Sequence, residues 1–302
     1  VNPTHIPATP DAGAMVLAEL GAMQSRPPAL PADADLTALL PHTGGVPGTW
    51  VTAPRKPPAA AAAARGVTVY AHGGGFEYTN PHLEHVMAYR LSEATGRPVL
   101  AVDYRLAPAH RYPAALDDVV TAYRSLLAQG VPASRIVLAG ESAGATLVLS
   151  ALLVLKQAGD ALPAGALAVS PQTDLTLSSP SIDANDGRDV VDRAVLDHVR
   201  TQYLAGARPD QGPQSPLHGD LRGLPPLLVV AGSREVLLDD ARRFAEAVSD
   251  AAGTVSLDIY DDMPHAFHAS VLGADPLPAA VTFLARVGEW SSSLAAVQDR
   301  TA

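Results

Sequence analysis

The feature that most constrains the fold is a regular alternation of short apolar runs and helical patterns from Gly66 onward. The apolar runs cover residues 67–72, 98–104, 135–142, 165–171, 226–232 and, more weakly, 255–262. Most of them are continuously apolar, which is typical of strands buried on both faces of a parallel sheet. Helical patterns separate or follow them at residues 83–95, 115–129, 143–157, 238–252 and 279–297. The alternation predicts an α/β fold with helices on both sides of the sheet.

Two segments do not fit this alternation. Residues 1–30 contain one amphipathic helical stretch, and residues 178–210 are polar and rich in proline and aspartate before a helical pattern at 192–204. We expect both segments to lie across the top of the sheet. The proline- and alanine-rich stretch at 55–66 is expected to be an exposed connector.

Charge and composition exclude several classes of partner and chemistry. The formal net charge is -10, whereas nucleic acids and anionic membranes select for basic patches, so we expect neither partner. The chain has no cysteine, which excludes disulfides and thiolate chemistry. No apolar run approaches the roughly 18 residues of a membrane span. The first residues lack the basic and apolar regions of a secretory signal, so a cytoplasmic location is expected.

A candidate nucleophile lies in "GESAG", residues 140–144, between an apolar run and a helical pattern. In this context G-x-S-x-G predicts a sharp strand-to-helix turn that exposes the serine hydroxyl. Glycines are needed two residues before and after Ser142, because larger side chains would collide at so tight a turn. The helix N-terminus would stabilise developing negative charge beside the serine. The alternative is a capping serine at an ordinary turn.

A nucleophilic serine needs a base, and the base needs an orienting acid. In enzymes with such a turn the acid and then a histidine follow the serine along the chain. The histidines after Ser142 are His198, His218, His265 and His268. His265 is the preferred base because it follows Pro264 in the loop after the last predicted strand.

The acid is expected after the preceding strand, where the candidates are Glu235, Asp239 and Asp240. Glu235 comes three residues after the strand-ending Gly232, so its carboxylate can turn over the edge of the sheet. The two aspartates are better interpreted as first-turn charges of the following helix. We therefore prefer Glu235 and keep Asp239 as the alternative.

Three adjacent glycines in "HGGGF", residues 72–76, follow the first predicted strand of the alternation. The stretch matches neither a phosphate-binding P-loop nor a dinucleotide-binding glycine motif. An oxyanion hole requires N–H donors near the developing negative charge. We expect the N–H groups of Gly73, Gly74 and Ala143 to supply them, with His72 as a hydrogen-bonding brace of the loop.

These motifs occur in order with "VDYRLAP", "YPAALDD", "SPQTDLT", "GLPPLLVVAG" and "EVLLDDARRFA". Together they closely resemble the hormone-sensitive-lipase-like family of α/β-hydrolases, the bacterial group of small esterases, from about Val67 to Phe283. The resemblance implies an eight-stranded, mostly parallel central sheet with a small helical cap. The cap would comprise an N-terminal segment, residues 1–45, and an insertion around residues 178–210 of a catalytic domain spanning 46–302.

The resemblance also implies an activity and its partners. We expect a serine carboxylesterase that hydrolyses short-to-medium acyl or aryl esters through an acyl-enzyme, with the triad Ser142, His265 and Glu235. No metal or cofactor is expected, the partner is a small ester, and family members often form homodimers. The same scaffold also supports amide hydrolysis, acyl transfer or elimination, whereas a non-catalytic ligand-binding module is disfavoured by the presence of His265.

The sequence departs from the family pattern inside the turn and leaves the substrate pocket open. Glu141 stands where members commonly have Asp or Thr, which is expected to alter hydrogen bonding behind the serine. The candidate pocket walls are Phe76, Tyr78, Tyr203 and Phe267. Each of these aromatic residues is equally consistent with ordinary packing.

Overall fold

The structure is a computed structural model that describes residues 1–25, 27–39, 45–54, 66–273 and 275–298. Within these residues, nine strands form one sheet in the order β1-β9-β8-β7-β6-β4-β5-β3-β2. The strands are β1 (Thr4–Ile6), β2 (Asp35–Leu39), β3 (Gly48–Thr52), β4 (Val67–Ala71), β5 (Val99–Val102), β6 (Ile136–Glu141), β7 (Gly165–Val169), β8 (Leu227–Gly232) and β9 (Val255–Tyr260). All six predicted strands are present, and the mostly parallel α/β-hydrolase fold is confirmed.

The described sheet has nine strands where eight were expected. The N-terminal β1 runs parallel to β9 at one edge, with Thr4 opposite Asp258. At the other edge, β3 is antiparallel to β5 and β2 is antiparallel to β3. The remaining pairs, from β5 through β4, β6, β7 and β8 to β9, are parallel. Parallel pairing brings the carboxyl ends of the central strands to one edge of the sheet.

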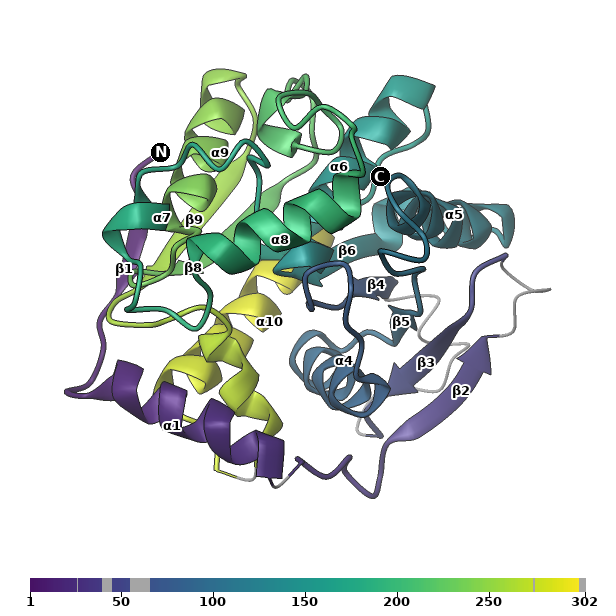
Figure 1. The fold of residues 1–302 in the computed structure, drawn as a ribbon. Helices are drawn as coiled ribbons and strands as arrows, with labels where there is room; N and C mark the ends of the chain where they lie inside the picture. Colours follow the sequence, from purple (N-terminus) through teal and green to yellow (C-terminus); the bar gives the residue numbers. More distant parts are fainter. Residues whose placement is uncertain (26, 40–44, 55–65, 274, 299–302) are drawn as a thin grey trace.

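Helices cover both faces of the sheet (Figure 1). Within the described residues, they are α1 (Ala12–Ser25), α4 (Pro81–Thr95), α5 (Ala114–Ala128), α6 (Ala143–Ala158), α7 (Ser181–Ala184), α8 (Arg193–Leu204), α9 (Leu238–Asp250) and α10 (Pro278–Gln298). Short 3-10 turns are η1 (Ala133–Arg135), η2 (Pro216–His218) and η3 (Phe267–Leu272). One buried cluster joins the sheet to α5, α6 and α9, and a second joins it to α1, α4 and α10. No helix in the described ranges is both long enough and apolar enough to span a bilayer.

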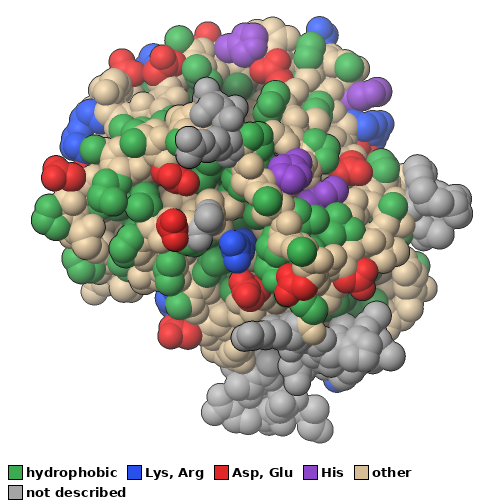
Figure 2. Space-filling view, turned by 90° about the horizontal axis from the view of Figure 1, so that it is seen from below, with side chains coloured by type: hydrophobic (Ala, Val, Ile, Leu, Met, Phe, Trp, Pro, Cys, Tyr) green, Lys and Arg blue, Asp and Glu red, His purple; other side chains and the backbone are tan. Residues whose placement is uncertain are grey.

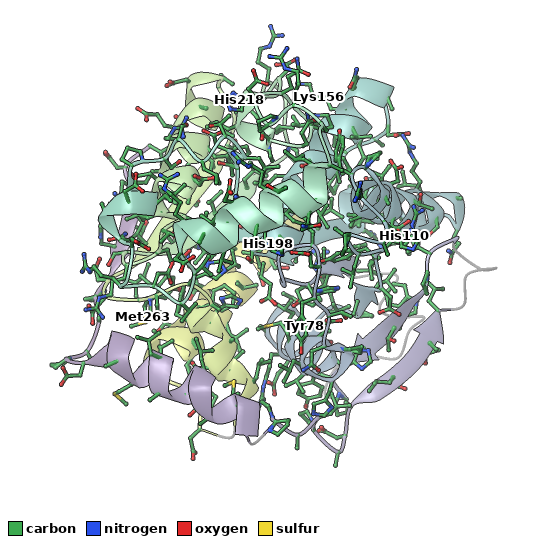
Figure 3. All side chains as sticks on the ribbon, in the orientation of Figure 1. Tyr78, His110, Lys156, His198, His218 and Met263 are labelled. Atoms are coloured by element: carbon green, nitrogen blue, oxygen red, sulfur yellow. The ribbon has the colours of Figure 1, made fainter. Side chains whose placement is uncertain are left out.

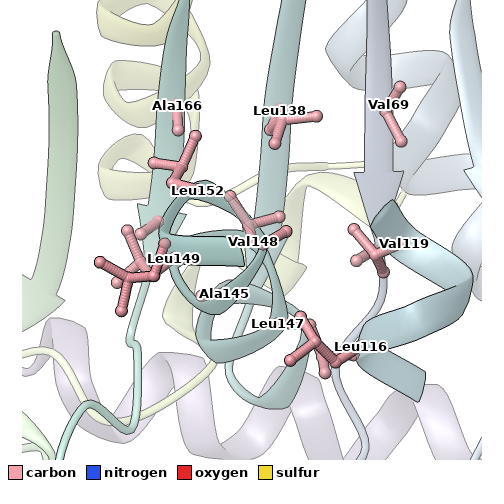
Figure 4. Packing of buried hydrophobic residues seen from close by; sticks show 14 of the residues in the cluster. Val69, Leu116, Val119, Leu138, Ala145, Leu147, Val148, Leu149, Leu152 and Ala166 are labelled. Carbon is pink, nitrogen blue, oxygen red and sulfur yellow. The ribbon is translucent and has the colours of Figure 1, made fainter. Parts of the chain in front are cut away.

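The two clusters follow from the alternation of side chains along each strand. Val69 and Leu138 belong to the α6 side, whereas Tyr70 and Val137 belong to the α4 side. Figure 4 shows α6 packed against this face, with Val148 in the layer between helix and strands. Continuous apolar runs were required because both faces of the central strands are covered. This packing fixes the helix that begins directly after Ser142.

The loops at the carboxyl edge carry the candidate site. The insertion between β7 and β8 contains α7 and α8, and α8 lies in front of the sheet in the view of Figure 1. The N-terminal segment, which was expected to belong to the cap, contributes α1, and α1 packs near η3. The same segment also contributes the strands β1 and β2 of the central sheet. The division into a cap segment at 1–45 and a catalytic domain at 46–302 stays a prediction. Residues 40–44, and 55–65 of the predicted connector, lie outside the described residues.

Candidate active site

Ser142 occupies the sharp turn between β6 and α6. Its backbone has φ 51° and ψ -121°, a conformation that non-glycine residues adopt only when the surroundings enforce it. A Cβ on Gly140 would lie 2.4 Å from the Gly144 carbonyl oxygen, and one on Gly144 would lie 2.0 Å from the Ala71 carbonyl oxygen. Both positions therefore require glycine. Gly140 lies against the other side of the turn, as the sequence indicated, whereas Gly144 lies against the end of β4.

The structure brings Ser142, His265 and Glu235 together. The serine Oγ lies 2.9 Å from His265 Nε2, and His265 Nδ1 lies 3.3 Å from Glu235 Oε2. The other carboxylate oxygen of Glu235 accepts hydrogen bonds from the Ser170 hydroxyl at 2.7 Å and the Gly232 N–H at 2.5 Å. With its proton on Nδ1, the imidazole donates to Glu235 and can accept the serine proton.

The surroundings of His265 favour its protonated form. Burial alone disfavours the imidazolium, but the hydrogen bond and charge of Glu235 outweigh it and raise the pKa of His265 above its ordinary value. The charges of Asp189 and Glu141 act in the same direction. The raised pKa means that the surroundings stabilise the imidazolium that forms when His265 accepts a proton.

The three other histidines lie outside this hydrogen-bond chain. His198 on α8 pairs with Glu77 at 3.2 Å, and His218 on η2 pairs with Asp174 at 3.0 Å. They lie well apart in Figure 3. His268 is buried and bonds through Nε2 to Glu141. Within the described residues, only His265 lies between a serine hydroxyl and a buried carboxylate.

The alternative acids have structural partners. Asp239 accepts a hydrogen bond from the Ser181 N–H at 2.9 Å, at the start of α7. Asp240 accepts hydrogen bonds from the N–H groups of Thr173 and Asp174 and from the Ser179 hydroxyl. Burial raises the pKa of Asp240 to about 6 despite these donors. Both carboxylates thus brace the loop after β7, and neither is bonded to His265.

The glycine loop lies beside the serine. A Cβ on Gly73 would lie 3.4 Å from the Cβ of Ser142. Gly74 has φ 109°, and a Cβ there would lie 2.2 Å from the Tyr78 carbonyl oxygen. In the described part of the chain, the N–H groups of Gly74 and Ala143 have no hydrogen-bond partner. Both line the cavity above Ser142, so they are free to bind an oxygen there.

His72 braces this loop as expected. Its Nδ1 lies 2.6 Å from the Gly73 carbonyl oxygen, and its ring stacks on Tyr104 with centroids 4.2 Å apart. The Tyr104 hydroxyl donates to the His72 carbonyl oxygen at 2.8 Å. These contacts occupy the ring of His72, which therefore supports the loop without reaching the serine.

Glu141, the unusual residue of the turn, joins three elements behind the serine. It accepts a hydrogen bond from the Tyr70 hydroxyl at 2.8 Å, faces the Gly73 N–H at 3.5 Å and pairs with His268. Burial alone favours the neutral acid, but the charge and hydrogen bond of His268, with the Tyr70 hydroxyl, lower the pKa of Glu141 to about 2. The turn, the glycine loop and η3 are thereby tied together by an ionised carboxylate.

A cavity of about 490 Å³ opens above Ser142. Its apolar lining is aliphatic apart from Tyr78, with Leu83, Met87, Val191, Val195, Leu196, Val199, Leu237, Ala266, Ala269 and Leu272. No Lys or Arg is among the described residues that line it, whereas Glu84 and Glu141 are. Figure 2 shows acidic side chains spread over one face of the molecule, in keeping with the formal net charge of -10. The cavity therefore suits neutral, largely apolar ligands.

Three of the four proposed aromatic walls do not line this cavity. Phe76 and Tyr203 are buried and stack on each other with centroids 3.8 Å apart. Phe267 is fully buried between Tyr260 and Phe283. The prediction was wrong for Phe76, Tyr203 and Phe267 because each ring gains more burial in the core. Tyr78 does line the cavity and is 67% exposed.

The sequence did not single out Asp189 or Ser170. Ser170, directly after β7, donates its hydroxyl hydrogen bond to Glu235. Asp189, in the loop between α7 and α8, accepts a hydrogen bond from the backbone N–H of His265 at 2.6 Å. For Asp189 the only signal was its location in a loop at the carboxyl edge, whereas Ser170 is the first residue of the stretch "SPQTDLT". The stretch around Asp189 holds several aspartates, and no pattern distinguishes one from another.

Comparison with known proteins gives consistent matches. A family model described as alpha/beta hydrolase fold matches residues 68–269. The chain is 43% identical over 201 residues to an acetyl-hydrolase of Streptomyces hygroscopicus, covering 66% of this chain and 67% of that one. It is 35% identical over 237 residues to an esterase of Acinetobacter venetianus, covering 78% and 77%. The structure matches a bacterial hormone-sensitive lipase family esterase with TM-score 0.85 and 34% identity, over 96% and 99% of the two chains.

Proposed function

Because the chain belongs to the hormone-sensitive-lipase-like family of α/β-hydrolases and is a carboxylic ester hydrolase, we propose that it is a serine carboxylesterase for short-to-medium acyl or aryl esters. Ser142 is the nucleophile, His265 the general base and acid, and Glu235 the orienting acid. The observation that carries the proposal is the continuous chain from Ser142 Oγ to His265 Nε2 at 2.9 Å and from His265 Nδ1 to Glu235 at 3.3 Å.

The reaction proceeds in two halves. His265 takes the hydroxyl proton as Ser142 Oγ attacks the acyl carbon, and the resulting tetrahedral intermediate carries its negative charge on the former carbonyl oxygen. When the intermediate collapses, His265 protonates the departing alcohol and leaves an acyl group on the serine. A water molecule then gives a proton to His265 and attacks this ester, which releases the acid and restores the serine.

The N–H groups of Gly73, Gly74 and Ala143 stabilise the oxyanion in both halves. The three N–H groups differ in their present contacts. The N–H groups of Gly74 and Ala143 have no partner within the described residues, whereas the N–H of Gly73 faces Glu141 at 3.5 Å. A long bond of this kind is easily exchanged for a shorter one to a charged oxygen. Fixed donors of this type stabilise the transition state more than the ground state.

The aliphatic cavity lining supports the substrate class. A volume of about 490 Å³ lies in the range of small-molecule sites, which bury most of their ligand's surface. The absence of Lys and Arg among the described lining residues, together with Glu84 and Glu141, disfavours anionic substrates. Residues of both α4 and α8 line the cavity, and we propose α8 and its insertion as the cap over the acyl or alcohol group.

The test compares wild type, Ser142→Ala and Ser150→Ala on p-nitrophenyl acetate, butyrate and palmitate. Ser150 is a matched control because it is a buried serine on the same helix, α6, with no hydrogen-bond partner among the described residues. We expect Ser142→Ala to lose on the order of a thousandfold or more in kcat and Ser150→Ala to keep full activity. The two shorter esters should be the better substrates.

Mass spectrometry of the enzyme mixed with substrate completes the test. An acyl adduct on Ser142 supports the proposed route, and transfer of that acyl group to an added alcohol would indicate a transferase. Turnover without any adduct, and without loss in Ser142→Ala, would contradict the proposal and favour an elimination. Cleavage of matched anilides beside the esters separates amide from ester hydrolysis.

A further inference from the structure

Asp189 connects the insertion between β7 and β8 to the two loops that carry the proposed acid and base. Its Oδ1 accepts hydrogen bonds from the His265 N–H at 2.6 Å and from the Val190 N–H at 2.8 Å. Its Oδ2 accepts a third, from the Val236 N–H, at 2.8 Å. All three donors are backbone groups, so the carboxylate acts on the path of the chain itself.

The two donors distant in sequence belong to the proposed base and to the residue after the proposed acid. The His265 N–H belongs to the base, at the end of the loop after β9, and the Val236 N–H follows Glu235 in the loop after β8. Asn185 of the same insertion donates a hydrogen bond to the Glu235 carbonyl oxygen at 2.8 Å. The insertion therefore holds both polar ends of the peptide group that follows Glu235, and it also holds the backbone N–H of the base.

The carboxylate also acts through its charge. Asp189 is half-buried, and burial raises its pKa, whereas His265 and the N–H donors act against that increase. Its negative charge raises the pKa of His265, together with those of Glu235 from the loop after β8 and Glu141 from the end of β6. Removing the Asp189 charge would thus make the His265 imidazolium less stable.

We propose that Asp189, in the insertion between β7 and β8, is a positioning residue that holds Glu235 and His265 in place relative to each other. The inference rests on the proposed function, because it requires His265 to be the base. The same contacts extend to the cavity wall, since Val191 and Leu237 line the cavity and lie two residues after Asp189 and one after Val236. A substrate in the cavity therefore contacts side chains of the two segments that Asp189 joins by hydrogen bonds.

The experiment compares Asp189→Asn, Asp189→Glu and Asp192→Asn with the wild type. Asp192 is the matched control because it is an exposed aspartate of the same loop that caps α8 through the Val195 N–H at 2.8 Å. Asparagine caps a helix as well as aspartate does. Each enzyme is assayed on p-nitrophenyl butyrate across the acid limb of the pH profile, and its thermal unfolding is recorded.

For Asp189→Asn we expect kcat to fall on the order of ten- to a hundredfold, as charged hydrogen bonds are lost, with KM nearly unchanged. The acid limb of kcat/KM should move to lower pH, because less negative charge faces His265. Asp189→Glu keeps the charge but displaces the carboxylate. Its kcat should therefore fall, while the acid limb of its kcat/KM profile stays at the wild-type pH. Asp192→Asn should match the wild type in both respects.

Three results would overturn the inference: wild-type kcat in Asp189→Asn, a loss without any shift of the acid limb, or an equal loss in Asp192→Asn. If Asp189→Asn does not fold, Asp189→Glu and hydrogen exchange of the wild type still decide, since the amides of Val236 and His265 should both be protected. Ser142→Ala separates the two proposals. Wild-type activity in that variant contradicts the proposed function, whereas its loss beside an unaffected Asp189→Asn contradicts only the role of Asp189.

Discussion

Replacing Glu235 with Gln should move the proton of the catalytic imidazole of His265 from Nδ1 to Nε2. One carboxylate oxygen of Glu235 accepts the Gly232 N–H at 2.5 Å and the Ser170 hydroxyl at 2.7 Å, and the other faces His265 Nδ1. In the glutamine, the oxygen must stay with Gly232, because an amide NH₂ cannot accept a hydrogen bond from an N–H. The NH₂ group then points at His265 Nδ1 and donates to it.

That hydrogen bond forces the imidazole proton onto Nε2, which lies 2.9 Å from Ser142 Oγ. A protonated Nε2 cannot accept the serine proton, so only the rare correct tautomer reacts. The wrong tautomer in a Ser-His-acid triad costs on the order of 10⁴-fold in kcat, or about 5 kcal/mol of transition-state stabilisation. The loss comes from one fixed donor, the Gly232 N–H, which leaves the amide no alternative orientation.

The assay is single-turnover hydrolysis of p-nitrophenyl acetate, with thermal unfolding to show that the variant is folded. Asp239→Asn is the control, since its carboxylate caps α7 through Ser181 and has no contact with His265. It should stay within about threefold of wild type, as expected for a site away from the reacting groups. Activity of Glu235→Gln within tenfold of wild type would refute the assignment of the acid, and a large loss in Asp239→Asn would reassign it.

Three further predictions concern the turn, the glycine loop and the base. Gly144→Ala places a Cβ 2.0 Å from the Ala71 carbonyl oxygen, so its free energy of unfolding should fall by about 3 kcal/mol or more in denaturant titrations. Gly73→Ala meets only ordinary contacts of 3.4 Å or more, so its melting temperature should be unchanged. Alanine keeps the N–H donor, but its methyl group lies beside Ser142 and would displace the substrate, so kcat should fall on the order of a hundredfold, as for a misplacement of about 1 Å. Because the pKa of His265 is raised and catalysis needs it neutral, kcat/KM should begin to fall with decreasing pH above the ordinary imidazole value; a midpoint below it would contradict this electrostatic account.

Much of the fold was predictable because the central strands are buried on both faces. A strand such as β6 must then be continuously apolar, and its sequence stands out without an alignment. The edge strands had no such signal. β1 has three residues and β2 is largely exposed, so their pairing depends on backbone hydrogen bonds that most residue types can form. The pattern of apolar runs located six strands, and β1 and β2 were missed for that reason.

The site was predictable where chemistry demands a residue type at a fixed spacing. The turn glycines, Ser142 and the order of acid and base follow from sterics and proton transfer, which any sequence must respect. The cavity walls do not follow from such rules. Phe76 and Tyr203 are loop-end and helix residues whose rings find each other in the core, and no periodicity indicates which way a loop aromatic points. Asp189 was missed because its partners are backbone N–H groups, which every residue but proline provides.

Backbone strain gathers around the candidate site and is held there by the fold. The described non-glycine residues with positive φ include Ser142 (51°) and Ser170 (51°), and also Phe76 (63°) after the glycine loop and Ala266 (62°) after His265. Each such conformation costs on the order of 1 kcal/mol or more and persists only where neighbours enforce it. The N–H of Ser142 is bonded to the Val169 carbonyl oxygen and that of Ser170 to the Val230 carbonyl oxygen, so the ends of β7 and β8 hold both turns. The free-energy cost of orienting these residues is therefore met when the chain folds. The groups are already in place when a substrate binds, so the attack requires no reorganisation of the backbone.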